Sequence, residues 1–463
     1  VFKSDYANES LTQHFKTNSL KGFGIDDLSE GIISCGAILY YLSETQHNKI
    51  QHITNIQRIA EDAYVWMDRF TIRNLELYGS ANENATTLLD IIDKTLSPMG
   101  GRLLKRWMAL PLKDIDSINK RYEVINYFID HTQVLADFQY QIKQISDLER
   151  LISKLATGKI SPREFVILKE SLDAILPLKQ IALKSNNEAL KVIGDQLNAC
   201  ELLREKIAST ISPDAPVALN KGNAIASGVN EELDDLRSIS QSGKDFLEGI
   251  EKRESESTGI PSLKVAFNNV FGYYIEVRNT HKDKVPTHWI RKQTLVNAER
   301  YITEELKEYE AKILGAEERI AKIEAEVYEK FMMWCAQYIQ QVQLNAQLVA
   351  QLDCLQSYTQ LAIENNYVRP QLEDSFVLDI KEGRHPVIEK QLAVGTPYIS
   401  NDVYLDTETQ QIIMITGPNM SGKSAILRQT ALIVLLAQMG SYVPATAVRM
   451  GIVDKIFTRV GAS

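Results

Sequence analysis

Cysteine is scarce in this 463-residue sequence, and its four cysteines are scattered with no C-x-x-C pair. This pattern argues against a disulfide framework and fits reduced, structural thiols in a cytoplasmic protein. The seven histidines form no metal-ligand spacing either. Neither residue type therefore points to a metal centre built from protein side chains.

Long apolar runs are also missing. The longest one, from Ala431 to Ala437, is far too short to span a bilayer, and no signal-peptide pattern opens the chain. The formal net charge of −9 argues against a surface that is basic throughout, but it allows one local basic patch. The first residues read like the interior of a domain, so we expect a piece of a longer protein.

Proline is absent from 299–366, and apolar residues there follow a 3-4-3-4 spacing. That spacing predicts a long helix packed against another, whose natural partner is the helix predicted over 230–257. Most of 115–212 also has a helical pattern. The alternative to two long paired helices is a plain helical bundle with a decorated loop. The seam consists of Leu306, Tyr309, Ile313, Ala316, Ile320, Ile323, Val327 and Trp334.

A short β passage interrupts the helices. Residues 263–267 and 273–277 alternate in polarity around a tight turn, which predicts a hairpin, and 289–295 is a candidate third strand. Between His281 and Arg300, five basic residues stand against the acidic Asp283 and Glu299. This basic island can hold DNA phosphates without reading bases. An ordinary solvated loop is the alternative. The basic positions are Lys282, Lys284, Arg291, Lys292 and Arg300. We expect Asn297 and Arg300 to begin the long helix, whose first N–H groups would add to phosphate contact.

The segment 417–424 has the form G-x-x-x-x-G-K-[ST]. The apolar run 411–416 before it predicts a strand buried in a parallel sheet, and 425–439 after it predicts a helix. Glycines let backbone N–H groups face phosphates, the lysine reaches the β- and γ-phosphates, and the serine hydroxyl ligates Mg²⁺. The predicted nucleotide contacts are Gly417, Pro418, Asn419, Met420, Ser421, Gly422, Lys423 and Ser424, with Ser424 as the magnesium ligand.

An acidic residue at the end of an apolar strand, which a P-loop ATPase needs to hold Mg²⁺ and position water, is missing between Lys423 and Ser463. Asp454 lies inside the strand-like run 453–460 and is interpreted as a surface carboxylate. We therefore expect half of a nucleotide site, and no catalytic residue for hydrolysis within this sequence.

Ten motifs along the chain together resemble the MutS family of DNA mismatch-repair ATPases. The likeness covers essentially the whole sequence and points to the bacterial mismatch-binding branch. The motifs are Gly22–Gly24, Arg73–Glu76, Pro98–Trp107, Asn297–Tyr301, Glu305–Tyr309, Glu382–Val387, Gly417–Ser424, Arg428–Ala431, Gly440–Pro444 and Ile456–Gly461.

The resemblance implies a mainly α fold with mixed α/β ends. A long-helix lever core would carry a small β clamp at its tip and lead into part of an ABC-type P-loop ATPase domain. Residues 1–48 would end a connector domain, 49–243 and 304–370 would form the core with its levers, 244–303 the clamp, and 371–463 the truncated start of the ATPase domain. The mismatch-reading domain and the second half of the ATP site would lie outside this sequence.

The resemblance also implies ATP or ADP with Mg²⁺ as ligands, mismatched double-stranded DNA as substrate, a homodimeric parent protein and a MutL-type partner. Tyr398 and Ile399 stand where members of the family pack against adenine, and a tyrosine ring suits a purine. Two positions depart from the family pattern: Ser421 replaces a frequent glycine and Val296 a frequent basic residue. His385, in a Gly-Arg-His-Pro turn, is interpreted as structural.

Two other functions share some of these features. A coiled-coil ATPase of chromosome maintenance or recombination would have the phosphate loop and long helices, but the hairpin with its basic island and the short heptad tract argue against it. A non-enzymatic DNA clamp would keep the loop only as structure. Replacing Lys423 should abolish nucleotide binding in a mismatch-repair ATPase and in a coiled-coil ATPase, but should change nothing in a non-enzymatic DNA clamp.

Overall fold

The computed structural model describes residues 1–46, 50, 53, 56–59, 61–80, 85–268, 272–393, 395–418 and 421–459. The chain is mostly helical with small sheets, as expected, and divides into two compact units. One unit contains 1–159, 167–204 and 337–463, and the other contains 160–166 and 205–336. Over the described part, no helix combines the length and apolar character needed to cross a membrane.

The first unit opens with two packed helices, α1 (Ser4–Phe15) and α2 (Ser29–Gln46). They approach closely at Gly36, where an added Cβ would come within 2.6 Å of the Ala7 Cβ. Leu11, Leu20 and Ile32 are buried in the small apolar cluster between them. This end of the chain therefore has a core of its own.

The helical core of the first unit surrounds α14 (Ile339–Asn365), which is buried along most of its length. Its neighbours are α4 (Leu88–Ile92), α5 (Pro98–Ala109), α6 (Ile115–Asp130), α7 (Thr132–Gln144), α8 (Leu148–Ala156) and α10 (Glu188–Gln196). The first unit also contains α3 (Arg69–Asn74), while α9 (Pro162–Lys184) and α11 (Glu201–Thr210) each contribute residues to both units. The 3₁₀ helices among the described residues are η1 (Leu20–Phe23), η2 (Glu61–Ala63), η3 (Leu219–Lys221), η4 (Asn279–Lys284) and η5 (Ala336–Tyr338).

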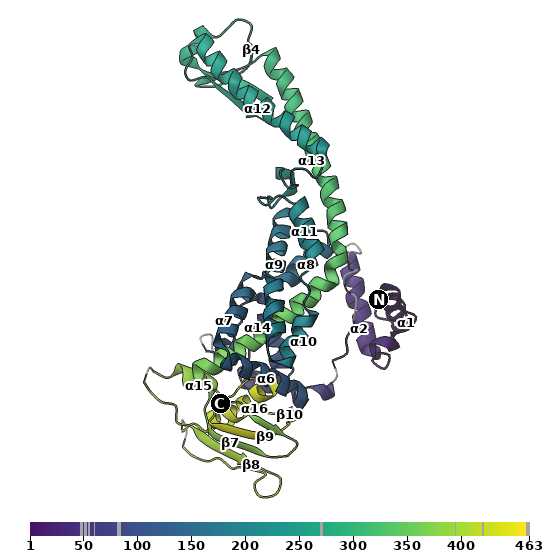
Figure 1. Ribbon diagram of the computed structural model, residues 1–463, viewed down its shortest axis with the longest axis vertical. Helices are drawn as coiled ribbons and strands as arrows, with labels where there is room; N and C mark the ends of the chain where they lie inside the picture. Colours follow the sequence, from purple (N-terminus) through teal and green to yellow (C-terminus); the bar gives the residue numbers. More distant parts are fainter. Residues whose placement is uncertain are drawn as a thin grey trace. The chain divides into compact units, whose positions relative to one another are not determined.

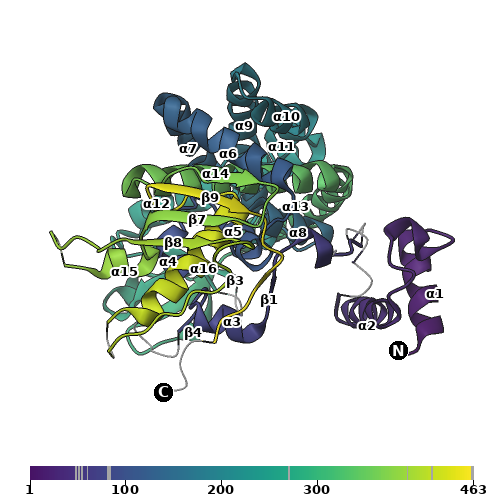
Figure 2. The same ribbon diagram turned by 90° about the horizontal axis from the view of Figure 1, so that it is seen from below.

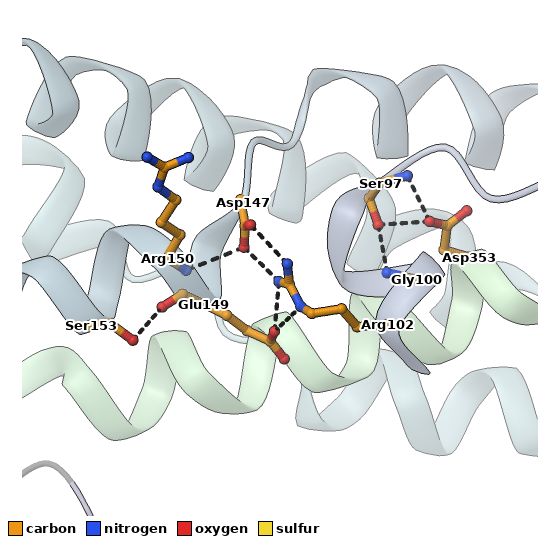
Figure 3. A network of polar contacts seen from close by, with 8 residues as sticks. All are labelled: Ser97, Gly100, Arg102, Asp147, Glu149, Arg150, Ser153 and Asp353. Carbon is orange, nitrogen blue, oxygen red and sulfur yellow. Dashed lines mark hydrogen bonds and ion pairs between the residues drawn. The ribbon is translucent and has the colours of Figure 1, made fainter. Parts of the chain in front are cut away.

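A buried carboxylate joins α14 to the start of α5 (Figure 3). Asp353 accepts hydrogen bonds from the backbone N–H groups of Leu96 and Ser97, both at 2.8 Å, and from the Ser97 hydroxyl at 2.6 Å. Ser97 in turn accepts from Gly100 N–H as the N-cap of α5. Burial raises the pKa of Asp353, and these donors act in the opposite direction. The packing is so close that a Cβ on Gly100 would lie 2.1 Å from the Asp353 Oδ2.

A second polar group in Figure 3 ties α5 to α8. Arg102 donates to both Asp147 oxygens, at 3.0 and 2.7 Å, and to Glu149 at 2.8 Å. Asp147 is also the N-cap of α8 and accepts from Arg150 N–H. The hydrogen bond to Asp147 is the largest effect on Arg102 and raises its pKa. The helix start and the interhelical pair thus share one carboxylate.

A four-stranded sheet in the order β6-β9-β7-β8 closes the first unit. Figure 2 shows β9, β7 and β8 side by side, and α16 contacts β7. Leu432, Ile433 and Leu435 of α16 belong to one apolar core shared with α5, α6, α14 and the sheet. The elements are β6 (Gln371–Glu373), β7 (Leu378–Gly383), α15 (Pro386–Gln391), β8 (Asn401–Leu405), α16 (Lys423–Met439) and β9 (Ala447–Gly451), while β1 (Trp66–Met67) pairs in parallel with β10 (Lys455–Ile456).

The second unit is built on two long helices, α12 (Glu231–Thr258) and α13 (Glu304–Cys335), which run side by side in Figure 1. Asn230 and Thr303 cap their N-termini through hydrogen bonds from backbone N–H groups. Gly259, with φ of 62°, is the C-cap of α12, which ends one residue beyond the predicted end at 257. The helices are antiparallel, because Arg253 pairs with Glu305 while Arg237 pairs with Glu324.

A four-stranded antiparallel sheet lies between these helices in the chain, in the order β2-β3-β5-β4. The predicted hairpin is confirmed as β2 with β3, and the candidate third strand is confirmed as β4. Ile275, Trp289 and Tyr301 pack into one apolar cluster with Leu306 and Ile313 of α13. The strands are β2 (Lys264–Asn268), β3 (Gly272–Arg278), β4 (Ile290–Thr294) and β5 (Ala298–Ile302).

Two expectations for 299–366 are wrong. The helix does not begin at Asn297 or Arg300, because Ala298–Ile302 forms β5, which pairs with β3, and α13 begins only at Glu304. The helix is also divided by η5, so that α13 and α14 are separate.

The apolar seam holds only in its first half. Leu306, Ile313 and Ala316 are buried, but Ile320, Ile323, Val327 and Trp334 are only partly buried. The buried positions shift to Glu324, Tyr328, Phe331 and Cys335. A charged residue therefore occupies the packed face that the spacing assigned to isoleucine and valine.

Candidate functional site

The phosphate loop leads directly into α16, as the sequence predicted. Gly422 is the N-cap of α16 and adopts φ of 88°, and Gly417 adopts φ of 156°. A side chain at Gly422 would be strained by this left-handed backbone. The first N–H groups of a helix have no partner within it, so those of α16 are available to an anion beside the loop.

The Lys423 side chain lies within the loop. Its ammonium donates to the carbonyl oxygens of Gly417 and of Pro418, the latter at 2.9 Å. Ser424 is exposed in the first turn of α16, and Ser421 is exposed beside it. Asn419 and Met420 lie outside the described residues. The described residues thus keep a cation, a hydroxyl and a helix N-terminus together.

The strand predicted for 411–416 is wrong. Residues 412–416 have no regular secondary structure, and the side chains of Ile412 and Met414 are 84% and 86% exposed. A strand needs a neighbouring strand to take up its N–H and C=O groups, and no described strand pairs with this segment. Its apolar side chains instead line a groove of about 590 Å³ with residues of β8, α16 and β10.

Tyr398 and Ile399 have different environments. The Tyr398 hydroxyl donates to Gln429 Oε1 at 2.9 Å, and Gln429 is a fully buried residue of α16. Burial raises the pKa of Tyr398. Ile399 is 85% exposed. The structure therefore connects Tyr398 to the helix that follows the phosphate loop and leaves Ile399 on the surface.

Sequence reasoning missed Gln429. It stands three residues after Ile426 and four before Ile433, so a polar side chain interrupts the apolar face of α16. That interruption is the signal that could have identified it. Gln429 also packs against Gly383, where a Cβ would lie 2.7 Å from the Gln429 Nε2.

His385 caps α15 and does not face an open site. Its Nδ1 accepts from the N–H groups of Val387 and Ile388 at 3.3 Å each. Its side chain is buried, and burial, with a smaller contribution from the charge of Arg428, lowers its pKa to about 4. Arg428 is itself paired with Glu76 at 3.0 Å. The imidazole is therefore neutral and structural near pH 7.

The basic positions of the 244–303 segment are surface residues of η4 and β4, with one exception. Lys282 and Lys284 lie in η4, and Arg291 and Lys292 lie on β4; all four are exposed. Lys282 and Lys292 form no ion pair with any described residue. Arg291 pairs with Glu299 at 3.3 Å.

Arg300 is the exception because its guanidinium is occupied within the sheet. It donates to Glu276 at 3.0 Å and to Gln293 at 2.9 Å, and it lies 4.2 Å from the centre of the Tyr274 ring. Asn297 is exposed in the turn before β5, and its carbonyl accepts from Asn279 N–H. Neither residue belongs to a helix N-terminus, so that source of phosphate contact is absent at these two positions.

Comparisons with known proteins agree with the sequence motifs. The family model described as MutS domain III matches residues 70–359, which is more than half of the chain. The chain belongs to the MutS family. Two further models match at its ends, MutS domain II over 1–54 and MutS domain V over 413–463, and the MutS domain V match includes the phosphate loop.

Curated MutS relatives match over the whole length of the chain. A protein of Flavobacterium johnsoniae is 76% identical, one of Flavobacterium psychrophilum 75% and one of Porphyromonas gingivalis 53%, each named DNA mismatch repair protein MutS. The match covers 53%, 54% and 52% of these proteins, respectively. The chain thus spans about half the length of the relatives it matches.

Proposed function

We propose that this chain is part of a DNA mismatch-repair ATPase that binds mismatched double-stranded DNA and uses ATP to control its grip. The observation that carries the proposal is the N-terminus of α16 at Gly422, with the Lys423 ammonium bonded to the carbonyls of Gly417 and Pro418. Membership of the MutS family supports the same function, because the matched relatives are named for mismatch repair.

A triphosphate with Mg²⁺ fits the donors at this loop. The loop backbone from Gly417 to Gly422 would bind phosphate oxygens, Lys423 would neutralise the β- and γ-phosphates, and the exposed Ser424 hydroxyl would ligate Mg²⁺. The Lys423 ammonium would exchange its two carbonyl partners for phosphate. Tyr398 would pack on the adenine, and Ile399 would cover it from the surface. Bound Mg²⁺ would supply charge neutralisation, and no described residue takes the role of the acidic catalytic group.

The 244–303 segment is proposed to grip the DNA backbone. Lys282, Lys284 and Lys292 are exposed cations on one small sheet with its 3₁₀ helix, and such cations hold phosphates without reading sequence. Arg291 and Arg300 already have carboxylate partners, so we assign them a weaker share. Asn297 would contact the backbone only through its side chain.

The proposed domain organisation is that of the MutS family. Residues 1–48 would end the connector, 49–243 and 304–370 would be core and levers, and 371–463 would begin the ATPase domain. The whole protein would act in the bacterial cytoplasm as a homodimer with a MutL-type partner. ATP binding would then change the DNA grip through the levers, as coupling between two distant sites.

Calorimetric titration of an ATP analogue with Mg²⁺ tests the nucleotide site. This chain and a longer chain that extends past an acidic strand end would be titrated side by side. Lys423→Ala should weaken binding at least about tenfold, because one charge-assisted contact to phosphate is lost. Lys390→Ala is the matched control, an exposed lysine on α15, and should change nothing. Equal affinity of Lys423→Ala and the unmodified chain would favour a non-enzymatic DNA clamp.

A further inference from the structure

The C-terminal end of α16 is held by another part of the first unit. The last four carbonyls of a helix lack partners within it. Here Ala437 O accepts from the N–H of the C-cap Gly440 at 2.9 Å and also from the Tyr122 hydroxyl at 2.5 Å. Gln438 O accepts from Leu112 N–H at 2.9 Å, and Met439 O accepts from Arg121. Three consecutive carbonyls thus accept hydrogen bonds from α6 and the segment just before it.

The Gln438 side chain reinforces this attachment. It is fully buried, and its Nε2 donates to Leu112 O at 2.9 Å and to Val453 O at 3.0 Å. Its Oε1 accepts from Val453 N–H at 3.0 Å. We call the contacts of Leu112, Arg121 and Tyr122 with residues 437–439 the α16 joint.

Arg121 is the charged member of the α16 joint, and no carboxylate pairs with it among the described residues. Its guanidinium lies 3.5 Å from the centre of the Trp107 ring and points to the Met439 carbonyl. The negative end of the α16 dipole is the counter-charge available to it. Burial lowers the pKa of Arg121, as expected for a cation without a carboxylate partner.

The backbone of α16 is shaped to receive this side chain. Gly440, the C-cap, has φ of 81°, and a Cβ there would lie 2.5 Å from the Arg121 Cδ. A cavity of about 440 Å³, lined by Trp107, Arg121, Val124 and Leu355, lies beside this side chain. The contact is therefore specific but not locked by an ion pair.

The two ends of α16 have different surroundings. Its N-terminus carries the phosphate loop, and the α16 joint lies one helix length away, about 25 Å for 17 residues at 1.5 Å each. Every residue of α16 from 432 to 439 is buried, whereas its first turns are partly exposed. We treat the helix as a rigid body, so that a displacement at one end reaches the other. The dipole adds an electrostatic link, because an anion at the N-terminus and a cation at the C-terminus both stabilise it.

We propose that Arg121 is the positioning residue that couples nucleotide at the phosphate loop to the helical core, through the α16 joint. The inference rests on the proposed nucleotide site. Arg121 touches neither the loop nor the nucleotide. It fixes where α16 ends against α6, and α6 packs against α14 in the core.

Hydrogen–deuterium exchange of the complete 463-residue chain, with and without Mg²⁺ and a non-hydrolysable ATP analogue, tests this coupling. Nucleotide should slow exchange at 421–427 and, at least threefold, at 112–122, where Leu112 N–H reports the α16 joint directly. Arg121→Met should keep the change at 421–427 and lose most of the change at 112–122. Arg121→Lys, which retains the charge, should recover part of it.

Arg106→Met is the matched control, because Arg106 is an exposed arginine of the neighbouring helix α5, and it should behave like the unmodified chain. Should Arg121→Met fail to fold, Tyr122→Phe removes only the hydroxyl bond to Ala437 and should weaken the response at 112–122. Two results would overturn the coupling alone. One is a full nucleotide-dependent slowing of exchange at 112–122 in Arg121→Met or Tyr122→Phe. The other is protection of the unmodified chain at 421–427 with none at 112–122. No protection at 421–427 in the unmodified chain overturns the nucleotide site and the coupling together.

Discussion

Arg237 of α12 donates to the carboxylate of Glu324 on α13 at 2.6 Å, and the Glu324 side chain is completely buried. The same guanidinium donates to Ile225 O at 2.8 Å and to Asp234 at 3.4 Å. Among the described residues, the second oxygen of Glu324 has no partner. A buried carboxylate of this kind depends on its single cation, because an unpaired charge in the interior is costly.

Arg237→Met should therefore destabilise the α12–α13 pair by about 3–5 kcal/mol, since it leaves the carboxylate buried and unpaired. The double variant Arg237→Met with Glu324→Leu should recover most of this loss, because no fully buried charge remains. Native-state hydrogen exchange of the α13 amides measures the local free energy of opening.

The same two helices supply the control for this pair. Arg319 and Glu232 form an ion pair at 2.8 Å with side chains 65% and 52% exposed. Exposed pairs contribute little, so Arg319→Met should cost less than about 1 kcal/mol. Equal losses for the two arginine variants would mean that burial of Glu324 does not determine the effect.

Glu324 also shows why part of the fold could be predicted and part could not. Helix ends followed from local signals, such as Asn230 at the start of α12 and Gly259 at its end. The exact face of α13 did not, because the burial of Glu324 depends on Arg237, which is 87 residues away in sequence. Apolar spacing alone placed Ile323 on that face instead.

The strands were predictable only in part. The hairpin of β2 and β3 followed from alternation around one turn. β5 pairs both with β4, directly before the turn at 295–297, and with β3, about twenty residues earlier. The sequence predicts a helix start there because Ala298–Ile302 shows no alternation of polarity and no glycine or proline separates it from α13. The run 411–416 has strand character, yet no described strand pairs with it, and its apolar pattern could not supply one.

The candidate nucleotide site and the α16 joint were also predictable only in part. The phosphate loop and α16 are consecutive in the chain, so a short motif predicted both. The contact of Tyr398 with Gln429 spans 31 residues, and that of Arg121 with Met439 spans 318. No local pattern reports a contact across such separations, and both required the folded structure.

His385 makes stability depend on pH. Its pKa is lowered from 6.5 to about 4 in the folded chain, chiefly by burial. Below pH 6.5 the unfolded chain binds a proton that the folded chain does not bind until about pH 4, so stability rises with pH across this window. We expect a loss of about 3 kcal/mol between pH 6.5 and pH 4 from this group at most, measurable as a falling urea midpoint.

His385→Asn isolates that contribution. Asparagine can accept the α15 N-cap bonds but does not titrate, so its stability should fall less steeply between pH 6.5 and 4. Carboxylates elsewhere titrate equally in both proteins, and the difference between the two curves therefore reports His385. Parallel curves would show that the imidazole is not held neutral by the fold.

Lys282 and Lys292 provide the sharpest test of the DNA grip, because they are exposed and have no ion-pair partner among the described residues. The double variant Lys282→Glu and Lys292→Glu should weaken duplex binding about tenfold or more. The slope of log affinity against log salt should fall by about 1.8, since each phosphate contact contributes about 0.9. Fluorescence anisotropy with matched and mismatched duplexes over a salt series measures both quantities.

A variant of Arg300 distinguishes an effect on DNA binding from an effect on the stability of the same sheet. Its guanidinium is held by Glu276, Gln293 and the Tyr274 ring, so Arg300→Gln should lower the melting temperature and leave the salt slope nearly unchanged. The double variant Lys206→Glu and Lys221→Glu, at two exposed lysines outside 244–303, matches the change in net charge of the Lys282 and Lys292 double variant. Phosphates are the same on every duplex, so losses from Lys282 and Lys292 must be equal for matched and mismatched DNA. A loss confined to mismatched duplexes would instead mean that this sheet reads the lesion, and an unchanged salt slope would mean that it does not hold the backbone.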